Sequence, residues 1–242
     1  MSELRVGTSG WQYKHWKSRF YPPELPTAKW LEYYARHFDT VELNNPFYRQ
    51  PEKKTFERWR RSVLDDFVYA VKLNRFITHL KRLNVDRQSI ERSYGTMAGL
   101  GPKLAVVLVQ LPPQMRFDEE RAQRFFGMVA RRRRRHALEP REASWFTDDA
   151  LAFLGRRNIA LVAADTPDWP THLAVTADFV YLRFHGPGRR YASNYEDDAL
   201  REWAERIKGW RAEERDVFAY FNNDEMGYAP RNALRLRELA AV

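Results

Sequence analysis

Acidic and basic side chains recur where the predicted strands of this sequence end. The segment from Asp178 to Gly186 alternates between two faces, and the last positions of one face carry Arg183 and His185. Because each buried charge must be offset by a partner, a strand of this design indicates a site as well as a core. The other predicted strands end in the same manner, at Thr8, Glu42, Asn44, Lys72, Gln110, Glu139, Arg141, Asp165, Tyr220 and Asn222.

These residue types permit acid–base and nucleophilic chemistry. The carboxylates Glu42, Glu139 and Asp165, together with the titratable His185, are candidate general acids and bases. Lys72 could form a Schiff base if its neighbours lowered the pKa of its ammonium group. We therefore predict these five residues as the catalytic set.

The two arginines at strand ends suggest an anionic substrate. Guanidinium groups of Arg141 and Arg183 could hold a phosphate or a carboxylate through paired hydrogen bonds. The alternative is a plug of ion pairs with no function, for example Glu139 with Arg183. The carboxylates and His185 could instead hold Mg²⁺ or Mn²⁺, but neighbouring cations disfavour a metal and we predict none.

Loops that follow the strands supply further candidate contacts to a substrate. Their aromatic rings could stack on a base or a sugar, or could pack as a lid, and His79 could cover the site or lie on the surface. With the strand-end residues, the predicted substrate-binding set is Trp11, Asn44, Tyr48, Arg49, His79, Gln110, Arg141, Arg183, Tyr220 and Asn222.

The elements that position these residues alternate along the chain. Apolar runs bounded by turn residues predict strands at 4–8, 40–44, 67–72, 104–111, 136–141, 159–164, 178–186 and 216–222. Helical spacing predicts helices at 27–37, 52–61, 87–99, 147–157, 193–211 and 232–239, and one more from Asp118 to the arginine run at 131–135. Ser193 and Glu196 suggest a capping box, and two prolines argue against a helix at 166–177.

Eight strands that alternate with helices in 242 residues predict an α/β fold of the (β/α)8 TIM-barrel type, with a doubly wound open sheet as the alternative. No linker or repeat interrupts the sequence, so we expect one domain over residues 1–242. In a TIM barrel, the candidate residues would meet at the carboxyl ends of the strands.

Composition limits the function further. The sequence contains no cysteine, which excludes disulfides, thiolate nucleophiles and cysteine-ligated metals. No apolar run is long enough to span a membrane and no signal-peptide pattern is seen, so we expect a cytoplasmic protein. The formal net charge of +9 suits an anionic partner, nucleic acid among them, or reflects an arginine-rich proteome. The run at 131–135 is expected on the amino-terminal face, away from the site.

Several motifs together resemble the YecE-like family, also called domain of unknown function 72. They are Gly7-Thr-Ser-Gly-Trp11, Val41-Glu-Leu-Asn-Asn-Pro-Phe-Tyr-Arg49, Lys72 with Ile77-Thr-His79, Gln110-Leu-Pro-Pro113, Glu139-Pro-Arg141 with Ser144-Trp145, Ala164-Asp165, Tyr181-Leu-Arg-Phe-His-Gly186 and Tyr220-Phe-Asn-Asn-Asp224. The resemblance covers about Val6 to Asn232 and implies a TIM barrel without a settled activity. The family often has a histidine after its Glu-x-Arg motif, where this chain has Glu142, which places in doubt a mechanism with a second base there.

We expect a hydrolase or lyase that acts on a phosphate- or carboxylate-bearing substrate, at the carboxyl end of the barrel. The alternatives are a nucleic-acid-binding protein without catalysis and a metal-dependent sugar isomerase. The sequence names neither a cofactor nor an oligomeric state, and it does not decide whether the chain is an enzyme.

Overall fold

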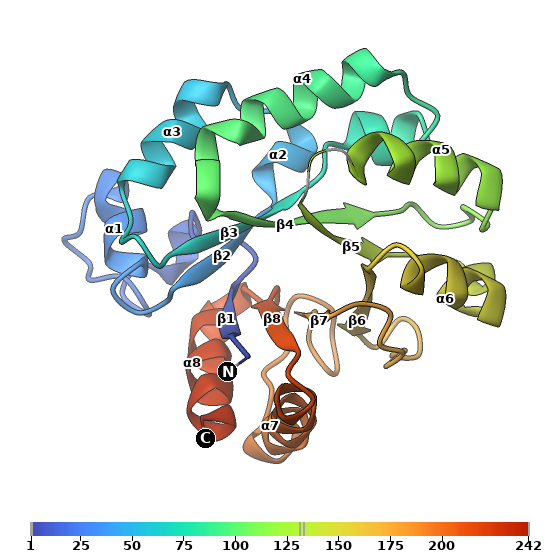
Figure 1. The fold of residues 1–242 in the computed structure, drawn as a ribbon. Helices are drawn as coiled ribbons and strands as arrows, with labels where there is room; N and C mark the ends of the chain where they lie inside the picture. Colours follow the sequence, from blue (N-terminus) through green and yellow to red (C-terminus); the bar gives the residue numbers. More distant parts are fainter. Residues whose placement is uncertain (1, 131, 133, 242) are drawn as a thin grey trace. The chain divides into compact units, whose positions relative to one another are not determined.

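In the described part of the chain, eight strands alternate with helices (Figure 1). The computed structural model describes residues 2–130, 132 and 134–241. The chain divides into two compact units. We call residues 1–42, 163–173 and 178–242 the terminal unit, and residues 43–162 and 174–177 the central unit. The alternation confirms the predicted α/β class.

The terminal unit is built around three parallel strands and two long helices. Strand β8 lies between β1 and β7, and Val6 pairs with Ala219 while Arg183 pairs with Tyr220. Helices α7 and α8 pack side by side next to β8 (Figure 1). Its elements are β1 (Leu4–Thr8), α1 (Trp30–Tyr34), β7 (Phe179–Phe184), α7 (Asp197–Ala212), β8 (Asp216–Phe221), α8 (Tyr228–Ala240) and all but the last residue of β2 (Thr40–Leu43).

The central unit contains a parallel sheet in the order β3, β4, β5, β6. Strand β4 is apolar along nearly its whole length and is buried, as expected for a parallel strand that is covered on both faces. Helices α3, α4 and α5 follow one another along the sheet (Figure 1). Its elements are α2 (Asn45–Tyr48), α3 (Lys53–Arg61), β3 (Val68–Lys72), α4 (Arg87–Met97), β4 (Leu104–Gln110), α5 (Glu119–Ala130), β5 (Arg135–Glu139), α6 (Asp148–Gly155) and the first part of β6 (Ile159–Asp165).

Most predicted elements agree with the structure to within a few residues. The prediction of a helix from Ser193 is wrong at its start, because α7 begins at Asp197. The Ser193 hydroxyl instead accepts hydrogen bonds from the N–H groups of Gly188 at 3.0 Å and Arg189 at 3.1 Å. A serine side chain can satisfy loop amides as readily as helix amides, so it stabilises the preceding loop here.

Several short helical segments were not predicted, and two of them contain predicted site residues. Asn45–Tyr48 forms α2, and Phe76–Leu80 forms a π-helical turn after β3. The segment 166–177 has no helix, as expected. Among the residues that the structure describes, no helix is both long and apolar enough to cross a membrane.

Candidate functional site

The Glu42 carboxylate is the centre of a buried hydrogen-bond network in the terminal unit. Arg183 binds it through two hydrogen bonds, from Nε to Oε2 at 3.0 Å and from Nη2 to Oε1 at 2.7 Å. Ser9 Oγ donates to Oε1 at 2.8 Å, and the Tyr181 hydroxyl donates to Oε2 at 2.7 Å. Four donors match the four lone-pair positions of an ionised carboxylate. This arrangement favours a role for Glu42 in fixing Arg183 over a role as a general base.

His185 lies beside this network and is completely buried. Its Nε2 is 3.5 Å from Nη1 of Arg183, and its Nδ1 is 3.2 Å from the side-chain amide of Asn222. Because a guanidinium can only donate, the Arg183 contact requires an unprotonated Nε2. A neutral His185 would then carry its proton on Nδ1, with the Asn222 carbonyl oxygen turned toward it.

Tyr220 and Trp11 are more deeply buried than a substrate-binding role requires. The Tyr220 hydroxyl lies 2.7 Å from Thr40 Oγ1, and its ring packs against Tyr181 with centroids 5.3 Å apart. Burial raises the pKa of the Tyr220 hydroxyl well above its usual value. The Trp11 carbonyl accepts a hydrogen bond from Tyr21 at 2.7 Å, and only 3% of Trp11 is exposed. Both residues support the terminal unit from within its core.

Asp165 does not have the orientation that we predicted. Its Oδ2 accepts a hydrogen bond of 2.8 Å from Trp203 Nε1, so the carboxylate is directed toward α7. Burial raises the pKa of the Asp165 carboxyl, and the hydrogen bonds from Trp203 and Tyr195 oppose this shift. Its backbone carbonyl accepts the N–H of His185 at 2.8 Å. Within the terminal unit, Asp165 therefore connects strand and helix and holds the backbone of His185.

In the central unit, Lys72 and His79 contact the ring of Phe47. The Lys72 ammonium lies 4.1 Å from the centroid of that ring, and the His79 ring meets it edge-on at 4.8 Å. The Thr78 hydroxyl is 2.9 Å from Nδ1 of His79. Burial, and then the positive charges of Lys72, Arg141 and Arg75, lower the pKa of His79 to about 4. His79 is therefore neutral near pH 7.

Glu139 lies in the same unit and has two neighbours that donate to one oxygen. Gln110 Nε2 donates to Oε1 at 2.7 Å, and Arg141 Nη2 approaches the same oxygen at 3.4 Å. The Glu139 carboxylate is almost fully buried. Within the central unit, Glu139 pairs with Arg141, and within the terminal unit, Arg183 pairs with Glu42.

Three other predicted residues lie around α2. Asn44 immediately precedes this helix, whereas Tyr48 is 70% exposed and Arg49 is exposed after it. The last two are available to solvent and so remain candidates for contact with a ligand.

Glu142 occupies the position where the resemblance would lead one to expect a histidine. Its Oε2 accepts the N–H of Ser144 at 3.0 Å and also the Ser144 hydroxyl. Glu142 thus caps the turn that follows β5, and its carboxylate serves the backbone there.

The predicted site sets did not include Tyr181, Ser9 or Phe47. Alternation along its strand places Tyr181 on the face of Arg183, and Phe47 is one of the loop aromatics that were expected near the site, so both carried a signal. Nothing comparable marks Ser9, because it follows its strand, where the period of two no longer applies.

The structure brings the predicted residues into two groups. The terminal unit contains Glu42, Arg183, His185 and Asn222, and the central unit contains Lys72, His79, Gln110, Glu139 and Arg141. That all of them form one pocket stays a prediction, as does the single domain. Within the ranges 2–130 and 134–241 and at residue 132, no three His, Asp or Glu side chains are placed to hold a metal ion.

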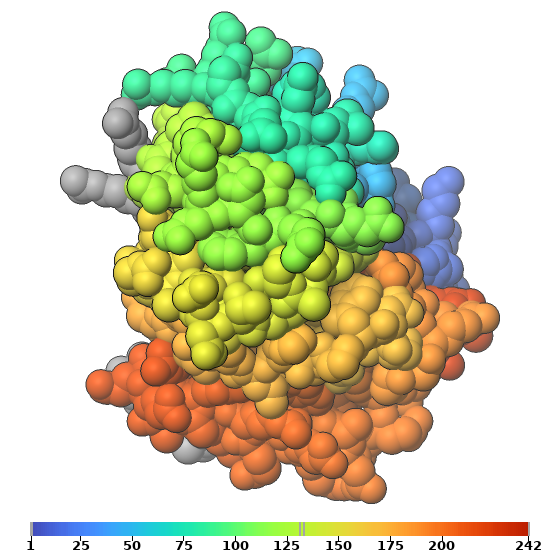
Figure 2. Space-filling model, turned by 90° about the vertical axis from the view of Figure 1, so that its right-hand side faces the viewer, coloured from blue at the N-terminus to red at the C-terminus, as the bar shows by residue number. Residues whose placement is uncertain are grey.

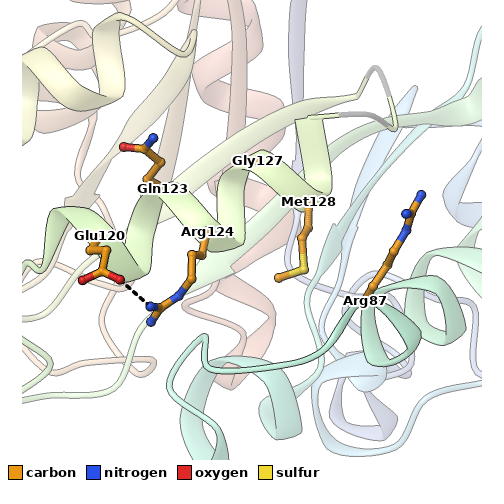
Figure 3. Close-up of a pocket in the computed structure, with 6 residues that line it drawn as sticks. All are labelled: Arg87, Glu120, Gln123, Arg124, Gly127 and Met128. Carbon is orange, nitrogen blue, oxygen red and sulfur yellow. Dashed lines mark hydrogen bonds and ion pairs between the residues drawn. The ribbon is translucent and has the colours of Figure 1, made fainter.

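A hollow of about 590 Å³ on the outer surface of the central unit contains none of these residues. It lies between α4 and α5 (Figure 3). Its charges are already paired, since Arg124 contacts Glu120 at 2.8 Å and Arg87 contacts Glu91 at 3.1 Å. We therefore assign no function to this hollow.

A family described as "Protein of unknown function DUF72" matches residues 5–242 of the chain. Among known proteins, the "UPF0759 protein YunF" of Bacillus subtilis (strain 168) is 28% identical over 277 residues. This alignment covers 99% of the present chain and 95% of the relative.

Solved structures agree with this match. A DUF72 family protein from Enterococcus faecalis V583 has a TM-score of 0.86 at 22% identity, and the match covers 99% of this chain and 96% of that one. A DUF72 family protein from Thermotoga maritima MSB8 has a TM-score of 0.77 at 26% identity, with 98% of each chain covered. The fold is TIM-barrel-like and α/β, as predicted from the sequence.

Proposed function

Because the chain belongs to the DUF72 family, whose description assigns no reaction, we propose a function from the geometry of its strand ends. The protein is an enzyme, a hydrolase or lyase, that binds a phosphate- or carboxylate-bearing substrate and breaks a bond in it by acid–base chemistry. Substrate binding takes place at the carboxyl ends of the strands, where TIM barrels place their sites.

The observation that carries this proposal is the charge around His79. The positive charges of Lys72, Arg141 and Arg75 lower the pKa of this imidazole, and the carboxylate of Glu139 opposes them. Positive charge beside a half-buried side chain favours an anion, because the anion offsets that charge at low local dielectric. The neutral His79 adds a group that can donate or accept a hydrogen bond without repelling a cation.

The acid–base groups follow from the same clusters. Glu139 is a buried carboxylate next to Arg141, and both Gln110 and Arg141 donate to its Oε1. In the terminal unit, His185 is oriented by Arg183 and Asn222. A buried imidazole or carboxylate with fixed neighbours is the usual form of a general acid or base.

The first experiment tests anion binding through the pKa of His79. We expect an NMR titration of the wild type to give a value of about 4. Inorganic phosphate should raise this pKa, because a bound anion stabilises the imidazolium. Lys72→Met should raise it without phosphate, since it removes a nearby cation, and should weaken the phosphate effect.

Lys81→Met is the matched control. Lys81 also lies over an aromatic ring, that of Phe76 at 5.7 Å, but it is solvent-exposed. This variant should leave the pKa of His79 and its response to phosphate unchanged. Equal effects of the two lysine variants, or no response to phosphate at all, would refute the anion site.

The second experiment tests turnover. A small-molecule extract is incubated with wild type and with Glu139→Gln, and anionic compounds are followed by mass spectrometry. We expect the wild type to consume at least one anionic compound that the variant leaves intact. If no compound is consumed, but DNA or RNA is bound with an affinity that falls steeply with salt, the protein is a nucleic-acid-binding protein instead.

A further inference from the structure

A second hollow in the central unit lies at the opposite ends of the strands. It has a volume of about 400 Å³ and is bounded by the last turns of α5, the start of β5 and the turn between α6 and β6. Figure 2 shows the outer surfaces of α5 and α6, in lime green and yellow, next to each other. The residues that matter are Phe126, Val129, Arg134, His136, Arg157 and Ile159.

Two guanidinium groups in this hollow are held in place without being neutralised. Arg134 donates to the carbonyl oxygens of Leu104 at 3.2 Å and Gly101 at 3.3 Å, which places it at the amino end of β4 as expected for the arginine run. Arg157 lies over the ring of Phe153, 3.9 Å from its centroid, and donates to the Phe153 carbonyl at 3.4 Å. Neither arginine pairs with a carboxylate in the described part of the chain, so both keep their full charge. Residues 131 and 133 of the run lie outside the described residues.

The wall of the hollow also includes Arg135, Asn158 and His136. His136 is buried, and its Nε2 lies 2.7 Å from the Tyr94 hydroxyl. Burial lowers the pKa of His136 to about 4, although a hydrogen bond to the Arg134 backbone opposes this shift. The imidazole is therefore neutral near pH 7. The apolar side chains of Phe126, Val129 and Ile159, each at most 3% exposed, also line the hollow.

We infer that this hollow binds a small organic phosphate at a site separate from the strand-end clusters. The phosphate group lies between Arg134 and Arg157, and the organic part packs on Phe126, Val129 and Ile159. A phosphate monoester carries about −1.5 to −2 charges at pH 7, which two unneutralised guanidinium groups balance. A carboxylate would leave about one of the two positive charges without a counter-charge.

Phenyl phosphate is the probe, because it joins the two chemical features that the hollow offers. Isothermal titration calorimetry on the full chain should show a binding site for phenyl phosphate whose affinity is unchanged in Lys72→Met. Arg157→Gln should weaken this binding at least tenfold. Arg156→Gln is the matched control, because Arg156 is the adjacent arginine but is exposed and contacts Glu119 at 3.5 Å. The control removes the same charge and should change the affinity less than twofold.

A second variant adds bulk at the rim and keeps the charges. Gly127 lines both this hollow and the hollow between α4 and α5, and a Cβ at this position would meet no atom within 4 Å. Gly127→Leu should therefore fold, with an unchanged or raised melting temperature, and should abolish binding of phenyl phosphate. Inorganic phosphate and benzoate should both bind more weakly than phenyl phosphate to the wild type.

Four results would overturn the inference: no binding, equal weakening by the two arginine variants, unchanged binding to Gly127→Leu, or weakening of phenyl phosphate binding by Lys72→Met. The last result would place the anion at the strand-end cluster instead. If inorganic phosphate does not raise the pKa of His79 in the wild type, but phenyl phosphate still binds in this hollow, only the proposed function is refuted.

Discussion

Replacement of Glu42 by glutamine should destabilise the protein strongly, because Glu42 forms a buried ion pair with Arg183 in the terminal unit. Both side chains are at most 1% exposed, and two hydrogen bonds of 3.0 and 2.7 Å join them. Glu42→Gln preserves the shape of the side chain but removes its charge. The glutamine amide nitrogen would then replace one carboxylate oxygen and would face hydrogen-bond donors that this oxygen had accepted from.

The size of the effect follows from burial. Removing one partner of a buried ion pair costs about 3–5 kcal/mol, because the other charge is left without compensation. A chain of this length loses about 2–4 °C of melting temperature per kcal/mol. We therefore expect Glu42→Gln to melt about 6–20 °C below the wild type when circular dichroism is followed during heating.

Glu139→Gln is the comparison. Arg141 approaches Glu139 at 3.4 Å and is less deeply buried than Arg183, with 14% of its side chain exposed. If Glu139 serves the reaction, its removal should leave the melting temperature unchanged or raised, because active-site charges often oppose stability. Turnover or ligand affinity should be lost.

Two outcomes would contradict this reasoning. A Glu42→Gln variant that melts within about 2 °C of the wild type would show that Arg183 does not depend on Glu42 for its burial. A Glu139→Gln variant that melts many degrees lower, with ligand binding intact, would make the Glu139–Arg141 pair structural.

Two further predictions concern the central unit. The pKa of His136 is about 4 when folded and near 6.5 when unfolded, so the unfolded chain binds the extra proton between these values. The contribution of His136 to the free energy of unfolding should be fully present above pH 6.5, and about 3 kcal/mol of it should be lost as the pH drops to 4. Urea denaturation at several pH values should show a smaller loss in His136→Phe. A Cβ at Gly99 would lie 2.5 Å from the Lys53 carbonyl oxygen, so Gly99→Ala should cost about 1–3 kcal/mol. At Gly95, a Cβ would meet nothing within 4 Å, so Gly95→Ala should raise the free energy of unfolding by up to about 1 kcal/mol. If urea denaturation shows equal effects for Gly99→Ala and Gly95→Ala, the steric argument is refuted.

The strands could be predicted because their apolar runs are long and are bounded by turn residues. Alternation also placed Tyr181, Arg183 and His185 on one face correctly, since a period of two leaves no choice once one residue is fixed. Alternation does not identify the carboxylate that pairs with Arg183. Glu42 is 141 positions away, and many carboxylates satisfy the same pattern.

Asp165 shows where this reasoning fails. Its strand runs Ile-Ala-Leu-Val-Ala-Ala-Asp, with apolar residues on both faces. A strand without alternation does not indicate which face its last residue joins. The Asp165 carboxylate points toward α7, where it accepts a hydrogen bond from the indole N–H of Trp203.

The clusters in loops could be predicted least. Phe47 lies in α2 and His79 in the π-helical turn, and neither segment has a period that the sequence displays. The turn depends on Asn74, whose Oδ1 accepts the N–H of Phe76 at 2.9 Å and whose Nδ2 donates to the Pro46 carbonyl at 2.8 Å. Such contacts between loops are set by the fold and carry no local signature.

The pairing of β1 with β8 has a consequence for synthesis on the ribosome. The N–H of Glu3 donates to Asp216 at 2.7 Å, across 213 positions of the chain. At a translation rate of about 5–20 residues per second, β1 waits about 10–40 s before its neighbour β8 exists. The strands from β3 to β5 pair with their successors along the chain and have no such delay. The terminal unit is therefore the last part of the nascent chain to close, and its first strand is the segment that a chaperone would need to shield.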